Sequence, residues 1–200
     1  MSSDYLPREK YTATEERIIS TTIASLSEQG YADTSIGGVA KRLDVSKGLV
    51  HYHFSSKEVL FQETIAYIYA KAFRFLRPRI DAAPDYWGRV EQFIRMSSAF
   101  YQTHPEHIKA LYELRSNFHP RHHTNYAITR YNRELADVGA LLAEGQGASE
   151  FREFDTHIMA LTLRQALNGL VIEMAKPSYD IAHHTNELVA LFHQGLCRKR

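Results

Sequence analysis

The sequence predicts an all-α protein with an N-terminal three-helix head and a C-terminal bundle of about six helices. Apolar residues recur three or four positions apart in most segments, which is typical of amphipathic helices. The strict alternation of apolar and polar residues that is typical of strands is absent. The later part of the chain is divided into blocks of helical length by Pro84, Pro105, Pro120 and Pro177.

The predicted head consists of three helices with capped starts. Thr12-Ala13-Thr14-Glu15 is a capping box, and the helix that follows ends at Gly30, where the apolar periodicity stops. Serines are predicted N-caps of the next two helices, which span 35–43 and 46–53. The first 56 residues are therefore assigned to one domain and residues 57–200 to a second.

The second domain is predicted to begin with a longer helix. Ser55-Ser56-Lys57-Glu58 is a capped start, and an amphipathic pattern continues from there toward Pro78. Five more helical blocks follow, over residues 85–103, 106–118, 122–145, 155–176 and 180–197.

Composition limits the compartment and the class of partner. The chain has 200 residues, one cysteine (Cys197) and a formal net charge of +1. No intramolecular disulfide is available, no apolar run is long enough to span a bilayer, and the N-terminus lacks the blocks of a signal peptide. We therefore expect a cytoplasmic protein with no membrane partner. Residues 30–60 carry four cations and three anions, and this small excess of positive charge means that two heads are needed for useful affinity to nucleic acid.

The segment 35–54 predicts a helix-turn-helix. Ala40 is small enough for two helices to cross, Val45 supplies an apolar residue just past the turn, and Asp44 tolerates a left-handed turn conformation. The side chains of the second helix that face away from this core are polar, cationic or absent, which suits phosphates and base edges. They are Ser46, Lys47, Gly48, His51 and Tyr52. The predicted partner is double-stranded DNA with a near-palindromic operator.

At these residues the chain, from Thr14 to about Ile65, resembles the DNA-binding head of the TetR (tetracycline-repressor) family of bacterial regulators. The resemblance implies a homodimeric repressor whose body binds a small-molecule effector. It implies DNA contacts at Thr34, Ser35, Ser46, Lys47, Gly48, Tyr52, His53 and Lys57. The motifs that carry it are Arg17-Ile18-Ile19, Glu28-Gln29-Gly30-Tyr31, Thr34-Ser35-Ile36, Val45-Ser46-Lys47-Gly48, Tyr52-His53-Phe54, Ser56-Lys57-Glu58 and Leu60-Phe61.

The chain departs from the family pattern in two places. His51 stands where the family usually has tyrosine, and Gly37-Gly38 replaces a charged pair. The glycines are expected to weaken their helix by about 1 kcal/mol each relative to alanine. His53 remains open between a DNA contact and a hydrogen bond within the head. Lys41 and Arg42 remain open between phosphate contacts and solvated surface.

Aromatic residues crowd the middle of the chain, where some could line a ligand cavity. Arg115 could pair with an anionic effector or form a surface salt bridge. The segment from Glu144 to Asp155 is similar to the betaine-responsive branch of the family, a resemblance that assigns no ligand. The expected effector-binding residues are Phe100, Tyr112, Arg115, Phe118, Tyr126 and Asn168.

The last two helices predict a dimer interface. Apolar residues go nearly all round the 155–176 helix, so it must be covered on two sides. The alternative is a monomer in which this helix is simply central; the family resemblance favours the dimer. The expected interface residues are Leu163, Leu167, Leu170, Leu188, Leu191 and Phe192.

Other functions receive little support from the sequence. A metal ion could be shared by histidine pairs such as His104/His107, His122/His123 and His183/His184. Several histidines, such as His104 and His119, instead precede prolines at helix boundaries. No metal or cofactor is therefore expected. No ordered nucleophile, glycine-rich phosphate loop or acidic metal cluster points to an enzyme. A metal- or metabolite-responsive activator or an architectural protein with the same head remains an alternative to the repressor.

Overall fold

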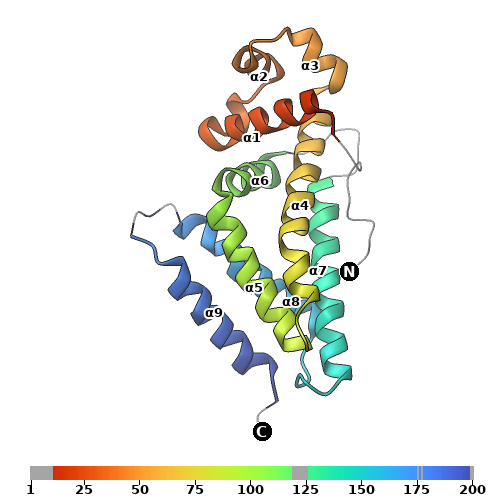
Figure 1. The fold of residues 1–200 in the computed structure, drawn as a ribbon, viewed down its shortest axis with the longest axis vertical. Helices are drawn as coiled ribbons and strands as arrows, with labels where there is room; N and C mark the ends of the chain where they lie inside the picture. Colours follow the sequence, from red (N-terminus) through yellow and green to blue (C-terminus); the bar gives the residue numbers. More distant parts are fainter. Residues whose placement is uncertain (1–10, 119–125, 175, 177, 199–200) are drawn as a thin grey trace. The chain divides into compact units, whose positions relative to one another are not determined.

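The computed structural model describes residues 11–118, 126–174, 176 and 178–198, with side chains at all of these except 126–131. Within this part of the chain there are nine helices and no strand, so the all-α prediction is confirmed (Figure 1). The helices are α1 (Ala13–Asp33), α2 (Ile36–Leu43), α3 (Lys47–His53), α4 (Lys57–Asp81), α5 (Tyr86–Thr103), α6 (Pro105–Asn117), α7 (Tyr126–Gly147), α8 (Thr156–Glu173) and α9 (Ile181–Leu196).

Helix starts lie where the capping residues predicted them. Thr12 forms the complete capping box with Glu15, and Ser35 and Ser46 accept hydrogen bonds from the backbone of α2 and α3. The end of α4 differs from the expectation, because Pro78 lies inside the helix, which continues to Asp81. A proline removes one backbone donor, and here the residues on both sides of it stay helical.

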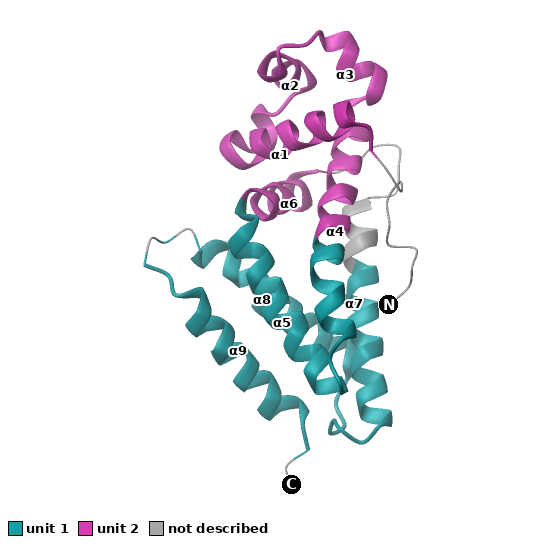
Figure 2. Ribbon diagram, viewed as in Figure 1, with its two compact units in different colours: residues 1, 72–105, 131–200 teal, residues 2–71, 106–130 magenta. Residues whose placement is uncertain are grey.

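The chain forms two compact units that divide inside α4 (Figure 2). Unit 2 contains residues 2–71 and 106–130, so α6 belongs with the predicted head and the first part of α4. Unit 1 contains residues 72–105 and 131–200. The functional boundary between residues 56 and 57 stays a prediction, since these units are defined by packing alone.

Unit 2 has one continuous hydrophobic core. Ile19, Val50 and Phe54 are fully buried in it, so the first and third helices share this core. An aromatic group extends it to α6: the Phe61 ring lies 5.5 Å from Tyr31 and 5.7 Å from Phe118, centroid to centroid. Burying a side chain of this size contributes about 1.5–3 kcal/mol, so this core holds α1, α3, α4 and α6 together.

Unit 1 is built around α5, which contacts both α8 and α9. Ile94, Leu163 and Leu167 are fully buried there. One ion pair lies in this interior, between Arg164 and Glu134 at 2.8 Å. None of the described helices is long and apolar enough to cross a membrane.

Candidate nucleic-acid interface

The turn between α2 and α3 has the geometry that the sequence predicts. Asp44 adopts a left-handed conformation (φ 56°, ψ 47°), and the Val45 N–H donates to the Ala40 carbonyl at 3.0 Å. At the start of α3 the Ser46 hydroxyl accepts the Leu49 N–H at 3.1 Å. These local bonds set the direction of a seven-residue helix whose core side is anchored by Val50.

The outward side of α3 carries most of the predicted DNA contacts. Val50 and the following Phe54 are fully buried and His53 is partly buried, while the other residues of the helix are open to the solvent. Tyr52 is the most open of the large apolar side chains, with 84% of its surface exposed. The five predicted recognition residues are all exposed: Ser46, Lys47, Gly48, His51 and Tyr52.

The two histidines of α3 have different surroundings. His51 is exposed, and its Nδ1 lies 3.3 Å from the Ser55 carbonyl. His53 is largely buried, with Nδ1 4.0 Å from a Glu15 carboxylate oxygen and its ring against the edge of Tyr52. The structure therefore places His53 within the head, whereas His51 remains accessible to a partner.

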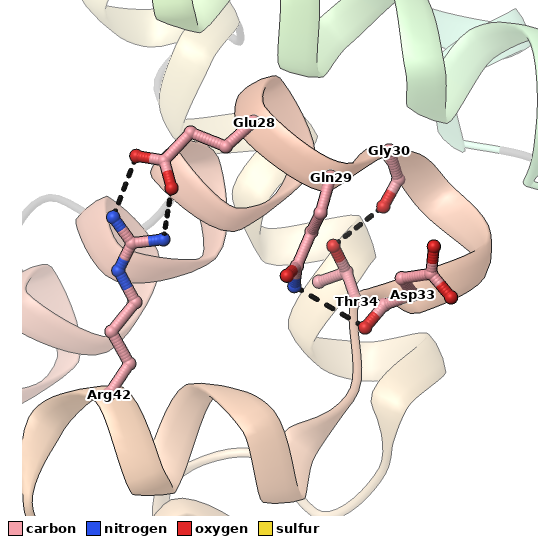
Figure 3. Close-up of polar contacts among 6 residues, drawn as sticks. All are labelled: Glu28, Gln29, Gly30, Asp33, Thr34 and Arg42. Carbon is pink, nitrogen blue, oxygen red and sulfur yellow. Dashed lines mark hydrogen bonds and ion pairs between the residues drawn. The ribbon is translucent and has the colours of Figure 1, made fainter.

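The two residues that precede α2 also differ. Thr34 is completely buried, and its hydroxyl donates to the Gly30 carbonyl at 2.7 Å (Figure 3). Gly30 has φ 81°, a conformation that glycine adopts without strain, and the Thr34 hydroxyl stabilises the break in α1 at this point. Ser35 is exposed, with its hydroxyl capping Gly38. Of the two, only Ser35 presents its side chain to a ligand.

Arg42 is engaged by a carboxylate of the same unit. Its two terminal nitrogens donate to the two oxygens of Glu28 at 2.6 and 2.7 Å (Figure 3). This hydrogen bonding lowers the pKa of the Glu28 carboxyl and raises the pKa of Arg42. The pair lies at the surface. Because Glu28 neutralises its charge, Arg42 contributes little net positive charge to the head. Lys41 is exposed without such a carboxylate in the described residues.

Lys57, the first residue of α4, is partly buried against aromatic rings. Its Nζ lies 5.0 Å from the Tyr31 ring centroid and 5.1 Å from that of Phe61. Burial lowers the pKa of this ammonium. The rings hold the cation by cation–π attraction, so it must leave them to reach a phosphate.

The sequence did not predict a contact from α6 to the break in α1. The Glu113 carboxylate accepts the Tyr31 N–H at 3.0 Å and also lies 3.3 Å from the Asn117 amide nitrogen. This bond joins residues far apart in the chain, so no local pattern could reveal it. It connects α6 to the segment that leads directly into the helix-turn-helix.

The predicted effector residues are dispersed over both units. Phe118 belongs to the core of unit 2, while Phe100 is buried in unit 1. Tyr112 is half exposed, and Asn168 bonds to Gln165. Arg115 lies on α6, and the side chain of Tyr126 falls outside the described residues. The effector set stays a prediction.

The predicted dimer residues are mostly covered by their own chain. Leu163, Leu167, Leu170, Leu188 and Phe192 are buried, because α5 and the neighbouring helices already pack against them. Leu191 alone of the six is open, with 63% of its surface exposed. The exposed apolar residues on these helices are Ile158, Leu161, Ile172 and Leu191.

The histidines do not assemble into a metal site within the described residues. No group of three or more His, Cys, Asp or Glu side chains there could hold a metal ion. His119, His122 and His123 fall outside the described part of the chain.

Residues 18–64 match the family model for bacterial regulatory proteins of the tetR family. The chain is 31% identical over 51 residues to the biofilm operon icaADBC negative transcriptional regulator IcaR of Staphylococcus aureus. That match covers 26% of this chain and 27% of the relative, so the alignment spans about a quarter of each protein.

Two solved structures share the fold over most of the chain. A putative transcriptional regulator from Saccharomonospora viridis in complex with choline has a TM-score of 0.78 at 20% identity, covering 93% of this chain and 98% of that one. AibR in complex with isovaleryl coenzyme A and operator DNA has a TM-score of 0.77 at 13% identity, covering 88% and 96%. At such low identity these similarities establish the fold only.

Proposed function

This chain belongs to the TetR family of bacterial regulatory proteins, and from that premise we propose that it is a homodimeric transcriptional repressor released from its operator by a small molecule. The observation that carries the proposal is the exposed side of α3. It presents Ser46, Lys47, His51 and Tyr52 to the solvent while Val50 anchors the helix to the core. A short helix with hydroxyl, cationic and aromatic groups on its open side suits the DNA major groove.

The contacts divide by their chemistry. Lys47 and the hydroxyl of Ser35 suit phosphate oxygens, which set affinity and register without reading sequence. His51 and Tyr52 carry donors and a ring that can meet base edges. IcaR, a relative over this segment, is a negative regulator, and the AibR structure contains operator DNA, which favours repression through an operator.

Dimerisation through α8 and α9 is the second part of the proposal. The open positions on α8 follow one helix face and include no charged residue; among them are Ile158, Leu161, Gln165 and Ile172. Leu191 of α9 adds a further exposed apolar side chain. Exposed apolar groups on adjacent helices favour contact with a second copy, and two heads would then meet successive major grooves about 34 Å apart.

Release by an effector is the third part. Two of the structural neighbours are complexes with small organic ligands. In this chain α4 belongs to both units, and Glu113 connects α6 to the break in α1. An effector that favours a conformation unable to bind the operator would weaken binding about 5–150-fold.

The DNA-binding part is tested with duplexes selected from random DNA by the purified chain. Lys47→Ala should weaken binding to all selected sequences and lower the salt slope by about 0.9 for each lost phosphate contact. Lys109→Ala, an exposed cation on α6 of the same unit, is the matched control. Fluorescence anisotropy over a salt series provides the measurement; identical slopes for Lys47→Ala and wild type would refute the placement of α3.

The dimer is tested by sedimentation at micromolar concentration. The wild-type chain should sediment at about twice its 23.0 kDa mass, and Ile172→Glu should convert it to monomer, because a charge would be buried in an apolar contact. Glu153→Gln, at an exposed position outside the helices, is the control. A monomeric wild type would contradict this part of the proposal.

A further inference from the structure

A cavity of about 230 Å³ lies inside unit 1, between the C-terminal part of α4, the N-terminal part of α5 and the C-terminal half of α7. All three segments belong to the same compact unit (Figure 2). None of the residues predicted to bind the effector lines it. The volume exceeds the ~150 Å³ of an engineered cavity that holds benzene, so it is sufficient for a small organic solute.

One wall of the cavity is apolar. Ile80, Phe93, Val138 and Leu141 line it, and Phe93 and Val138 are themselves buried. Such a wall receives an aliphatic group and excludes water from it. It provides no hydrogen bonds to a ligand, so specificity for polar groups must come from the charged lining residues.

The charged lining contains two half-buried groups of opposite sign, each with one buried polar atom that has no hydrogen-bond partner among the described residues. Arg77 and Asp81 pair with each other on α4, one turn apart. The Nε of Arg89 and the Oδ2 of Asp137, in contrast, are buried without a hydrogen-bond partner among the described residues. Glu144 adds a third carboxylate to the lining, after Asp81 and Asp137.

Leaving such groups unpaired is costly. A buried donor or acceptor without a partner destabilises the fold, and the cost is higher when the group is charged. The Arg89 guanidinium lies 5.3 Å from the Tyr86 ring centroid, which covers part of the group without accepting the Nε–H. A molecule that brings one acceptor and one donor into the cavity would satisfy both Arg89 and Asp137.

We propose that this cavity binds an α-amino acid with an aliphatic side chain. Its carboxylate accepts the Nε–H of Arg89, and its ammonium donates to Asp137, while Glu144 adds further negative charge to the lining. The side chain packs against Phe93 and the neighbouring apolar wall. Because Asp137 needs a hydrogen-bond donor, the site selects a primary ammonium over a quaternary one, which has no N–H.

This inference deepens the proposed function by naming a class of effector, and it rests on that function only for the step from binding to release of DNA. Binding is measured by calorimetry on the full chain with L-valine, L-leucine and L-isoleucine as probes. Isovalerate lacks the ammonium, isoamylamine lacks the carboxylate, and glycine betaine lacks the N–H donors. At least one of the three amino acids should bind at least about tenfold more tightly than these three analogues.

Two variants test the named contacts. Arg89→Gln and Asp137→Asn should each reduce amino-acid affinity at least about tenfold while thermal unfolding shows that both remain folded. Arg95→Gln is the control, because Arg95 lies on α5 outside the cavity, paired with Glu91 and Asn186. Equal losses in Arg89→Gln and Arg95→Gln would overturn the assignment.

The remaining outcomes separate this site from the proposed function. Failure of all three amino acids to bind the folded chain, or binding of isovalerate as tight as that of L-leucine, overturns the site. Amino-acid binding that leaves a bound operator in place supports the site and contradicts effector release. Amino-acid binding by a chain that binds no duplex supports the site and contradicts the regulator.

Discussion

The ion pair between Arg42 and Glu28 should lower the affinity of the head for DNA, and Glu28→Gln should therefore raise this affinity. Both terminal nitrogens of Arg42 are held by the two Glu28 oxygens, at 2.6 and 2.7 Å, and both side chains are exposed. The arginine is therefore at the surface of α2 but is neutralised by its partner. Removing the carboxylate charge frees one guanidinium in each head.

The size of the effect follows from the number of cations released. Each phosphate contact adds about 0.9 to the slope of log affinity against log salt, so two heads add about 1.8. With a slope change of that size, the ratio of the Glu28→Gln affinity to the wild-type affinity should be about twelvefold larger at about 50 mM salt than at about 200 mM salt. Fluorescence anisotropy with a selected operator duplex measures both slopes.

Two further variants isolate the role of Arg42. In Glu28→Gln/Arg42→Gln the freed cation is gone, so the slope should return to the wild-type value. Asp33→Asn removes an exposed negative charge near the end of α1 without releasing an arginine, and it should leave the slope unchanged. The reasoning is refuted if the double variant keeps the steeper slope, or if Asp33→Asn matches Glu28→Gln.

Two other substitutions test contacts within the units. Gly145→Ala should lower the free energy of unfolding by about 1–3 kcal/mol relative to Gly147→Ala, because its Cβ would lie 2.3 Å from a ring carbon of the fully buried Phe151. A Cβ at Gly147 meets nothing within 4 Å, and equal denaturant midpoints of the two variants would contradict the packing. Glu113→Gln should weaken the hydrogen bond to the Tyr31 N–H and lower the free energy of unfolding of unit 2 by about 1 kcal/mol. Hydrogen exchange at the Tyr31 amide should then become faster. Unchanged exchange would show that the bond is not formed in solution.

Local features of the sequence were sufficient for the helices and the turn. A capping hydroxyl and the backbone N–H it accepts are three residues apart, so Thr12, Ser35 and Ser46 mark helix starts wherever the chain folds. The left-handed conformation of Asp44 could also be predicted locally, because the tolerance of aspartate for this backbone conformation depends on the residue itself and its immediate neighbours. The polar and cationic residues on the open side of α3 were also predicted, but Leu49 was expected in the core; the structure instead buries Val50 and leaves Leu49 37% exposed.

Contacts between distant segments could not be obtained in this way. Periodicity indicates that Leu163 and Leu167 face an apolar surface, but it does not indicate whether that surface is their own chain or a second copy. The fold decided it, since α5 packs on α8 and buries both leucines. The same holds for Arg42, whose role depends on a carboxylate of α1 that only the packing of α1 and α2 brings within reach.

The sequence by itself thus determined the helical class, the helix starts and the open side of the recognition helix, because each depends on interactions within a few residues. The tertiary structure alone decided which polar and apolar side chains remain available. It buried Thr34, paired Arg42 with Glu28, and left the Nε of Arg89 and the Oδ2 of Asp137 without a hydrogen-bond partner among the described residues, beside one cavity. Availability depends on what covers a side chain, and that neighbour is brought in by folding from a distant part of the chain.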